Sequence, residues 1–186
     1  PLDMAFLFLE NSSRQLHMTA YQMFKVPARQ KNAWVNKVLS TFRNSEVAAP
    51  FNQKIKWLGK DVASWETVEP DLNYHVRHIA VPPPGTMQQF YDMVSFLNTP
   101  LLDRNLPLWD CYIIDGIEGN HVAIMLRVHH AMIDGGGALK LFRAAMNDKA
   151  SDKSIRAVWT PQQKKPRKRS SRKSQPQLKQ LLSTLS

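Results

Sequence analysis

The residues with the clearest chemical potential lie together in residues 121–137, where the sequence reads HVAIMLRVHHAMIDGGG. Two adjacent histidines, His129 and His130, are followed by Asp134 and by three consecutive glycines. Histidine titrates near neutral pH, so an imidazole here can take a proton from a hydroxyl or an amine and return it later. The stretch is therefore a candidate site of general acid–base catalysis.

A strand must deliver the histidine pair, because residues 121–129 have the pattern of a strand buried on both faces. The two faces consist of Val122, Ile124, Leu126 and Val128, and of Ala123, Met125, Arg127 and His129. Since side chains alternate along an extended chain, one histidine of the pair should face an open cleft and the other the scaffold. Residues 138–146 then have the composition of an amphipathic helix, which makes a strand–loop–helix connection.

Asp134 lies four residues after His130, a spacing that brings a carboxylate near an imidazole if the loop coils as one helical turn. The carboxylate can fix the tautomer of the ring, or it can pair with an arginine and brace the loop, and both roles remain open. The three glycines predict a bend or a close approach of the backbone. No metal site is expected, because H-E-x-x-H is absent and no further ligand lies at a useful short spacing.

Three stretches of the chain together resemble one enzyme family. His129–Gly135 is similar to the HHxxxDG motif of the coenzyme A-dependent acyltransferase superfamily, which includes chloramphenicol acetyltransferase and the condensation domains of peptide synthetases. Pro1–Leu7 (PLDMAFL) resembles the second half of the PLSPLDxxFL signature of bacterial wax ester synthase/diacylglycerol acyltransferases. Leu102–Asp110 (LDRNLPLWD) resembles the LDRxxPLWE segment of the same enzymes. The chain therefore resembles the N-terminal half of this family.

The resemblance implies transfer of a fatty acyl group from acyl-CoA to a long-chain alcohol or to diacylglycerol, giving a wax ester or a triacylglycerol. His130 would be the general base of a ternary complex that forms no acyl-enzyme. Acyl-CoA would be a co-substrate, and no other cofactor is implied. The resemblance also places residues 4–10 close to the entrance of the active site.

The other motif residues receive supporting roles from the same resemblance. Asp134 is expected to form a salt bridge that shapes the loop, with Arg127 or Arg104 as its partner. Gly135 is expected to let the loop turn. His129 is expected to be a supporting residue. Gly136 and Gly137 are expected to widen the space for a long chain.

The pattern of elements favours an α/β fold, and the resemblance implies a chloramphenicol acetyltransferase-like layered domain, with a mixed sheet and helices packed on it. Strands are expected at residues 17–26, 74–81, 108–114 and 121–128, with short ones within 51–58 and 65–68. Helices are expected at residues 29–43, 86–98 and 138–146, with a short helix or turn at 4–10. Residues 1–157 would form the N-terminal acyltransferase domain, 158–177 a basic flexible linker, and 178–186 the start of a helix leading to a C-terminal domain.

Composition separates a neutral domain from a basic tail. The 186 residues carry a formal charge of +10, but residues 1–152 contain 15 basic and 15 acidic side chains, so the excess lies beyond them. No apolar run is long enough to span a membrane, and the single cysteine, Cys111, excludes an internal disulfide. We therefore expect a cytoplasmic protein, with a peripheral position at the inner membrane or at a lipid-inclusion surface as the alternative.

Two other functions remain open. A condensation-type enzyme that joins carrier-bound acyl groups to amines would share the histidine motif, but it is not expected to carry the PLDxxFL stretch. A non-catalytic basic module that binds a membrane or a nucleic acid would not need an intact motif. The leading interpretation predicts acyl-CoA, a fatty alcohol or diacylglycerol, and the C-terminal domain of the same protein as partners, and no nucleic acid.

Overall fold

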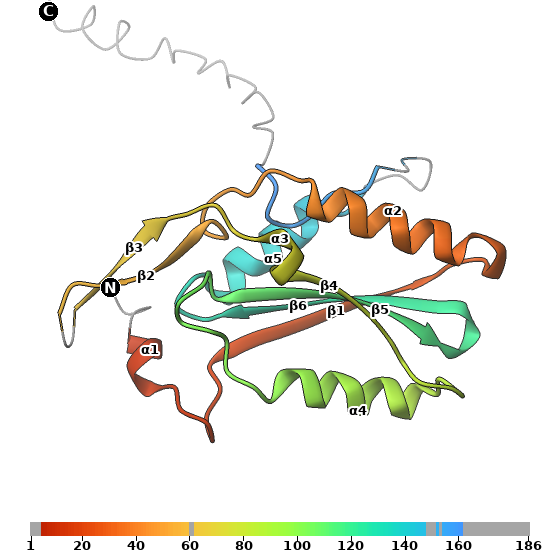
Figure 1. The fold of residues 1–186 in the computed structure, drawn as a ribbon, viewed down its shortest axis with the longest axis horizontal. Helices are drawn as coiled ribbons and strands as arrows, with labels where there is room; N and C mark the ends of the chain where they lie inside the picture. Colours follow the sequence, from red (N-terminus) through yellow and green to blue (C-terminus); the bar gives the residue numbers. More distant parts are fainter. Residues whose placement is uncertain (1–4, 60–61, 148–151, 153, 162–186) are drawn as a thin grey trace, which may run out of the picture.

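A four-stranded mixed sheet forms the centre of the computed structural model, which describes residues 5–59, 62–147, 152 and 154–161 (Figure 1). The strands, in spatial order, are β1 (His17–Lys25), β6 (His121–His129), β5 (Trp109–Ile117) and β4 (Val76–Ala80). Strand β6 pairs antiparallel with β1 and with β5, and β4 pairs parallel with β5. The strand that carries the histidines is therefore hydrogen-bonded on both edges.

Helices cover both faces of this sheet (Figure 1). One face carries α2 (Lys31–Arg43), the short α3 (Leu72–His75) and α5 (Gly135–Ala145), and the other carries α4 (Met87–Asn98). Helix α1 (Ala5–Leu9) and the hairpin of β2 (Gln53–Trp57) and β3 (Ala63–Thr67) lie near the end of the sheet where β6 ends. Single 3₁₀ turns at Ala28–Gln30 and Glu118–Asn120 complete the fold. None of the helices in the described part of the chain combines the length and apolar character needed to cross a bilayer.

The alternation of side chains along β5 and β6 divides the core into two layers. The layer toward α2 and α5 contains Trp109, Cys111, Ile113, Val122, Leu126 and Val128. The layer toward α4 contains Tyr112, Ile114, Ala123, Met125 and, from the helix, Phe90. Because helices exclude water from both faces of the sheet, apolar side chains predominate on both faces of β5 and β6. The predicted division of residues 121–129 between two faces is confirmed.

Local signals place some element boundaries correctly and others not. Helix α4 begins after Thr86, as predicted, with a capping box in which Thr86 Oγ1 accepts the N–H of Gln89 at 3.2 Å. Strand β4 begins later than predicted, because Asp71 caps the preceding short helix by accepting the N–H of Asn73 at 2.9 Å. His75 therefore ends a helix instead of lying in the strand.

The packed chain continues beyond residue 157, the predicted end of the domain. Trp159 is 1% exposed, its Nε1 donates to Ser45 Oγ at 2.7 Å, and its ring packs against those of Phe42 and Trp109. An aromatic side chain of this size contributes strongly to a core. The domain therefore includes Trp159. Residues 162–177 of the predicted linker, and the predicted helix start at 178–186, lie outside the described residues.

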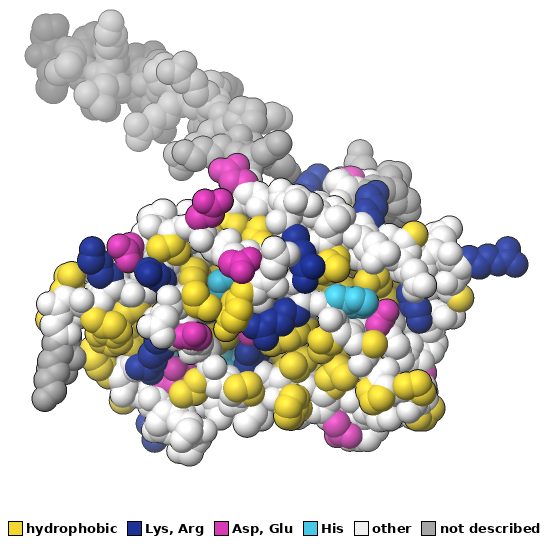
Figure 2. Space-filling view, in the orientation of Figure 1, with side chains coloured by type: hydrophobic (Ala, Val, Ile, Leu, Met, Phe, Trp, Pro, Cys, Tyr) yellow, Lys and Arg dark blue, Asp and Glu magenta, His cyan; other side chains and the backbone are white. Residues whose placement is uncertain are grey.

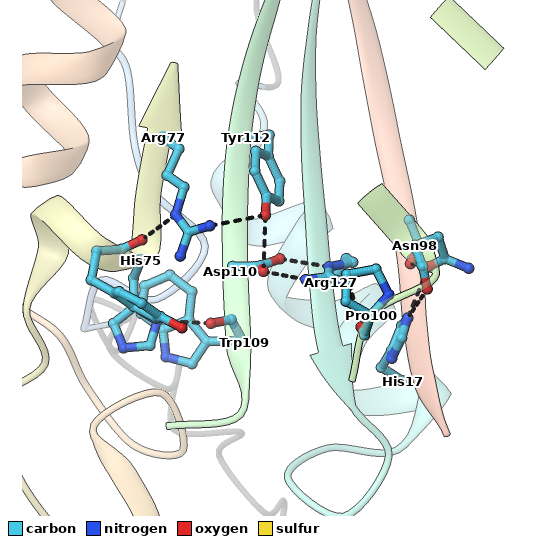
Figure 3. Close-up of polar contacts among 11 residues, drawn as sticks. His17, His75, Arg77, Asn98, Pro100, Trp109, Asp110, Tyr112 and Arg127 are labelled. Carbon is cyan, nitrogen blue, oxygen red and sulfur yellow. Dashed lines mark hydrogen bonds and ion pairs between the residues drawn. The ribbon is translucent and has the colours of Figure 1, made fainter. Parts of the chain in front are cut away.

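A buried ion pair joins β5 to β6 on the side of α4 (Figure 3). Arg127 Nε donates to Asp110 Oδ1 at 2.8 Å, Arg127 Nη1 donates to the carbonyl oxygen of Pro100 at 2.9 Å, and the Tyr112 hydroxyl donates to Asp110 Oδ2 at 3.3 Å. Removing one partner of such a pair typically costs about 3–5 kcal/mol, because the other charge is left buried and unpaired. Arg127 thus ties the segment after α4 to the sheet, and the prediction that it pairs with Asp134 is wrong.

Candidate active site

The histidine loop starts at the end of β6 and is held by backbone hydrogen bonds on both sides. The N–H of His129 donates to the carbonyl oxygen of Leu108 at 2.9 Å, and the N–H of His130 donates to that of Leu16 at 2.9 Å. Within the loop, the N–H of Met132 donates to the carbonyl oxygen of His129 at 3.0 Å. The segments before β5 and before β1 therefore set the positions of both imidazoles.

The two histidines face different surroundings, as strand alternation predicts. His129 is 0% exposed, whereas His130 is half-buried and reaches the surface. The ring of His130 stacks on the ring of Phe6 from α1, with centroids 5.1 Å apart and planes inclined at 29°. His130 is therefore the member of the pair that lies within reach of a molecule from solution.

His129 is held in one tautomer by its neighbours. Its Nδ1 accepts the N–H of Ala131 at 3.0 Å, so the ring proton resides on Nε2. That Nε2 lies 3.2 Å from Glu10 Oε1, an ion-pair distance at an orientation too poor for a hydrogen bond. Burial lowers the pKa of His129, opposed by the carboxylate of Glu10 and reinforced by the nearby charges of Arg104 and His17. His129 is therefore kept neutral beneath the loop.

Glu10 was not predicted from the sequence, yet it connects three parts of the site. Its side chain is 1% exposed, its Oε1 accepts the N–H of Leu16 at 3.1 Å, and its Oε2 lies 3.2 Å from Arg104 Nη2. Arg104 Nη2 also donates to the carbonyl oxygen of Leu7 at 2.7 Å, which fixes α1. A buried carboxylate requires such partners. Arg104 therefore pairs with Glu10, and the prediction that it pairs with Asp134 is wrong.

Asp134 forms the N-cap of α5. Its Oδ1 accepts the N–H of Gly137, and its carbonyl oxygen accepts the N–H of Ala138 at 2.9 Å. The glycines are thus the first residues of α5, and the predicted turn at Gly135 is wrong because this residue is already helical. A Cβ at Gly137 would lie 2.9 Å from Ile133 Cγ1, so this glycine allows the loop to pack against the first turn instead of opening space.

An apolar pocket adjoins the loop between α5 and the sheet. Its lining includes Phe51, Leu126, Val128, Ile133, Leu141 and Phe142. Its free space is only about the size of one water molecule, so the pocket does not hold an aliphatic chain in this structure. In the part of the chain that the structure describes, no three His, Cys, Asp or Glu side chains gather as a metal site.

A mixed sheet covered by helices on both faces, with a histidine loop after a central strand, defines the chloramphenicol acetyltransferase-like fold of acyltransferases and condensation domains. The family model for the wax ester synthase/diacylglycerol acyltransferase catalytic domain matches residues 1–186, and the chain belongs to this family.

Individual relatives agree with this assignment. The chain is 53% identical over 159 residues to the probable diacyglycerol O-acyltransferase Tgs4 of Mycobacterium tuberculosis, which covers 86% of this chain and 34% of the relative. It is 35% identical over 161 residues to the O-acyltransferase WSD of Acinetobacter baylyi, covering 86% and 34%. The solved wax ester synthase/diacylglycerol acyltransferase from Marinobacter aquaeolei VT8 has a TM-score of 0.79 at 29% identity, covering 87% of this chain and 41% of that one. The chain thus spans about a third of the length of its curated relatives.

Substitutions of Asp134 can separate its role as the helix N-cap from the effect of its negative charge. Asp134→Asn and Asp134→Ser keep an oxygen that accepts the N–H of Gly137, so both should lie within a few tenths of a kcal/mol of the unaltered protein. Asp134→Ala removes that acceptor and should lower the free energy of unfolding by about 1 kcal/mol. Urea unfolding of the full-length protein measures the difference. An Asp134→Asn variant as unstable as Asp134→Ala would show that the negative charge, and not the cap, is what the loop needs.

The lowered pKa of His129 predicts a pH dependence of stability. An unfolded histidine has a pKa of about 6.5, so the unfolded chain takes up protons below that value while buried His129 stays neutral. The contribution of neutral His129 is complete above about pH 6.5 and is lost as the pH falls toward its folded pKa.

The free energy of unfolding should therefore fall as the pH decreases below about 6.5, and His129→Gln should make this decrease smaller. Some decrease should remain, because burial also lowers the pKa of His75. Exposed His78 provides the control substitution, His78→Gln. Equal decreases in the His129→Gln variant and the unaltered protein would contradict the assignment.

Proposed function

We propose that this chain is the N-terminal part of an O-acyltransferase that moves a fatty acyl group from acyl-CoA to a long-chain alcohol or to diacylglycerol, with His130 as the general base. The observation that carries the proposal is the contrast within the histidine pair. His130 reaches the surface at the end of a buried strand, while His129 is sealed beneath it beside Glu10. The names of the relatives, diacyglycerol O-acyltransferase and wax ester synthase, support the same class of reaction.

In the proposed reaction, His130 takes the hydroxyl proton of the acceptor as the acceptor oxygen attacks the thioester carbonyl carbon. The tetrahedral intermediate then collapses, the carbon–sulfur bond breaks, and the proton passes from the imidazole to the thiolate of coenzyme A. General base catalysis typically contributes about 10²–10⁴-fold to the rate. No acyl-enzyme is required, because holding both substrates together in a ternary complex supplies several kcal/mol of the barrier reduction.

The N-terminus of α5 offers donors for the oxyanion of that intermediate. The first N–H groups of a helix have no acceptor within the helix, and Asp134 accepts the one from Gly137. The N–H groups of Gly135 and Gly136 are therefore the candidates. A Cβ at Gly135 would meet no atom within 4 Å, so a substrate can approach this part of the backbone closely.

His130→Ala tests the proposed base. In the full-length protein this substitution should reduce ester formation by at least ~10²-fold, because no other group takes the acceptor proton. The free energy of unfolding should change little, because the ring is half-buried and stacks on a single residue. The assay measures coenzyme A released from palmitoyl-CoA with hexadecanol, diacylglycerol or an amine as the acceptor.

The matched control is His78→Ala, which removes an exposed imidazole paired with Asp115 on β5. That variant should keep its turnover. Retained turnover in His130→Ala would remove the proposed base, and a preference for the amine would favour the condensation-type alternative.

We also propose a peripheral contact with the inner membrane or a lipid inclusion, because the proposed acceptors are lipids. An apolar surface suited to this contact lies on α1 and the β2–β3 hairpin, where five side chains are between 43% and 61% exposed (Figure 2). They are Phe8, Leu9, Trp57, Leu58 and Val62. The rings of Phe8 and Trp57 lie 5.9 Å apart, so the two elements form one surface beside the histidine loop. Apolar and tryptophan side chains of this kind favour the headgroup region of a bilayer.

Co-sedimentation with phospholipid vesicles tests this contact. The double substitution Trp57→Ser with Leu58→Ser should reduce the bound fraction of the full-length protein several-fold, because the hairpin loses its apolar tip. The matched control is Phe96→Ser, which removes a 77% exposed ring from α4 instead of from the hairpin. Equal loss of binding in both variants, or no loss in the double variant, would reject the hairpin as the contact.

A further inference from the structure

Helix α1 and the residue that follows it contact both histidines. Phe6 stacks on His130, and Glu10, just after the helix, lies against His129. Phe6 is partly buried in the apolar cluster that also contains Leu7, Ala131 and Met132. The reaction proposed above uses His130 but assigns nothing to the aromatic ring that lies on it.

The segment that carries Phe6 is held in place by contacts of the residues that follow it. Leu7 is 0% exposed, its carbonyl oxygen accepts a hydrogen bond from Arg104, and the side chain of Glu10 is held by Arg104 and by Leu16. These contacts fix the helix immediately after Phe6. The ring is therefore placed against His130 by the fold and does not merely fill space at the surface.

An aromatic ring carries partial negative charge on its face, so it attracts a cation that lies over it within about 6 Å. The 5.1 Å separation between the two ring centroids is inside this range, and the 29° inclination presents the face of Phe6 to the imidazole. Neutral imidazole gains little from this arrangement, whereas imidazolium gains more. An interaction that is stronger in the transition state than in the ground state accelerates the reaction.

We propose that Phe6 is a positioning residue for His130 whose ring face stabilises the imidazolium that forms when His130 takes the acceptor's proton. The inference rests on the proposed role of His130 as the base. In this step the acceptor's O–H bond breaks, its oxygen bonds to the thioester carbon, and the proton resides on the imidazole until it is transferred to the departing sulfur. Phe6 exchanges no proton or electron, and it acts only on the charge of the ring beside it.

Progressive fluorination of the Phe6 ring is the sharpest test, because fluorine withdraws electron density from the face with little change in shape. Phe6 is replaced in the full-length protein by phenylalanine carrying one, two or three ring fluorines. The readout is the single-turnover rate of ester formation, so that product release does not mask the chemical step. The logarithm of the rate should fall stepwise with each fluorine, to a total of about 2- to 30-fold, while the KM for acyl-CoA stays constant.

Two substitutions with natural amino acids accompany the fluorinated series. Phe6→Leu should lower the rate by a similar factor, because it keeps an apolar side chain without a ring face, and Phe6→Trp should retain most of the rate. The matched control is the same fluorination at Phe96, whose ring is 77% exposed on α4 and belongs neither to the site nor to the proposed lipid contact. Fluorination there should leave the rate unchanged.

A rate that does not depend on fluorination at Phe6, while Phe6→Leu is slow, would overturn the inference and leave the ring a packing role. An equal dependence at Phe96 would overturn it as well. Failure of the proposed function is a separate result: it would appear as retained turnover in His130→Ala, whatever the fluorinated proteins do.

Discussion

The hydrogen bonding of β6 on both of its edges is the constraint on which the site depends. Strands β1 and β5 fix its register, and the same pairing continues into the loop through the carbonyl oxygens of Leu16 and Leu108. In an extended chain, neighbouring side chains point to opposite faces, so this register decides which imidazole is buried and which is presented. A slip of one residue would exchange the surroundings of His129 and His130.

Buried charge explains why distant segments of the chain must meet at this point. Glu10 follows α1, Arg104 lies in the segment before β5, and His129 ends β6, and the three side chains form one cluster. A carboxylate with 1% exposure is tolerated only where partners replace the water it has lost. Two of the stretches that resemble family motifs, residues 102–110 and 129–135, therefore meet at Glu10 through Arg104 and His129. The third stretch joins them through Leu7, whose carbonyl oxygen accepts a hydrogen bond from Arg104.

The start of α5 shows how a local preference was overridden. Glycine is a poor helix former, so three consecutive glycines favour a loop when only local preferences are considered. In the structure, Asp134 caps the helix and Ile133 packs against Gly137, where a larger residue would collide. The carboxylate is engaged by the backbone of its own helix, while Arg127 and Arg104 are engaged by Asp110 and Glu10. Which acidic side chain pairs with each arginine is therefore decided by how close the two lie in the folded chain.

The sequence by itself determined the strand that carries the histidines, the division of its side chains between two faces, helix α4, and the contrast between a buried and an accessible histidine. These features depend on periodicities and caps that act over a few residues, which is why local patterns reveal them. Only the tertiary structure decided the partners of Arg127 and Arg104, the helical state of the glycines and the contacts of Phe6 and Glu10 with the histidines. One signal was available for Glu10, the single acid in the apolar stretch of residues 4–10, but its partners lie about a hundred residues away in the chain. Contacts of that separation arise from packing, and no local pattern encodes which of several possible partners a buried charge will meet.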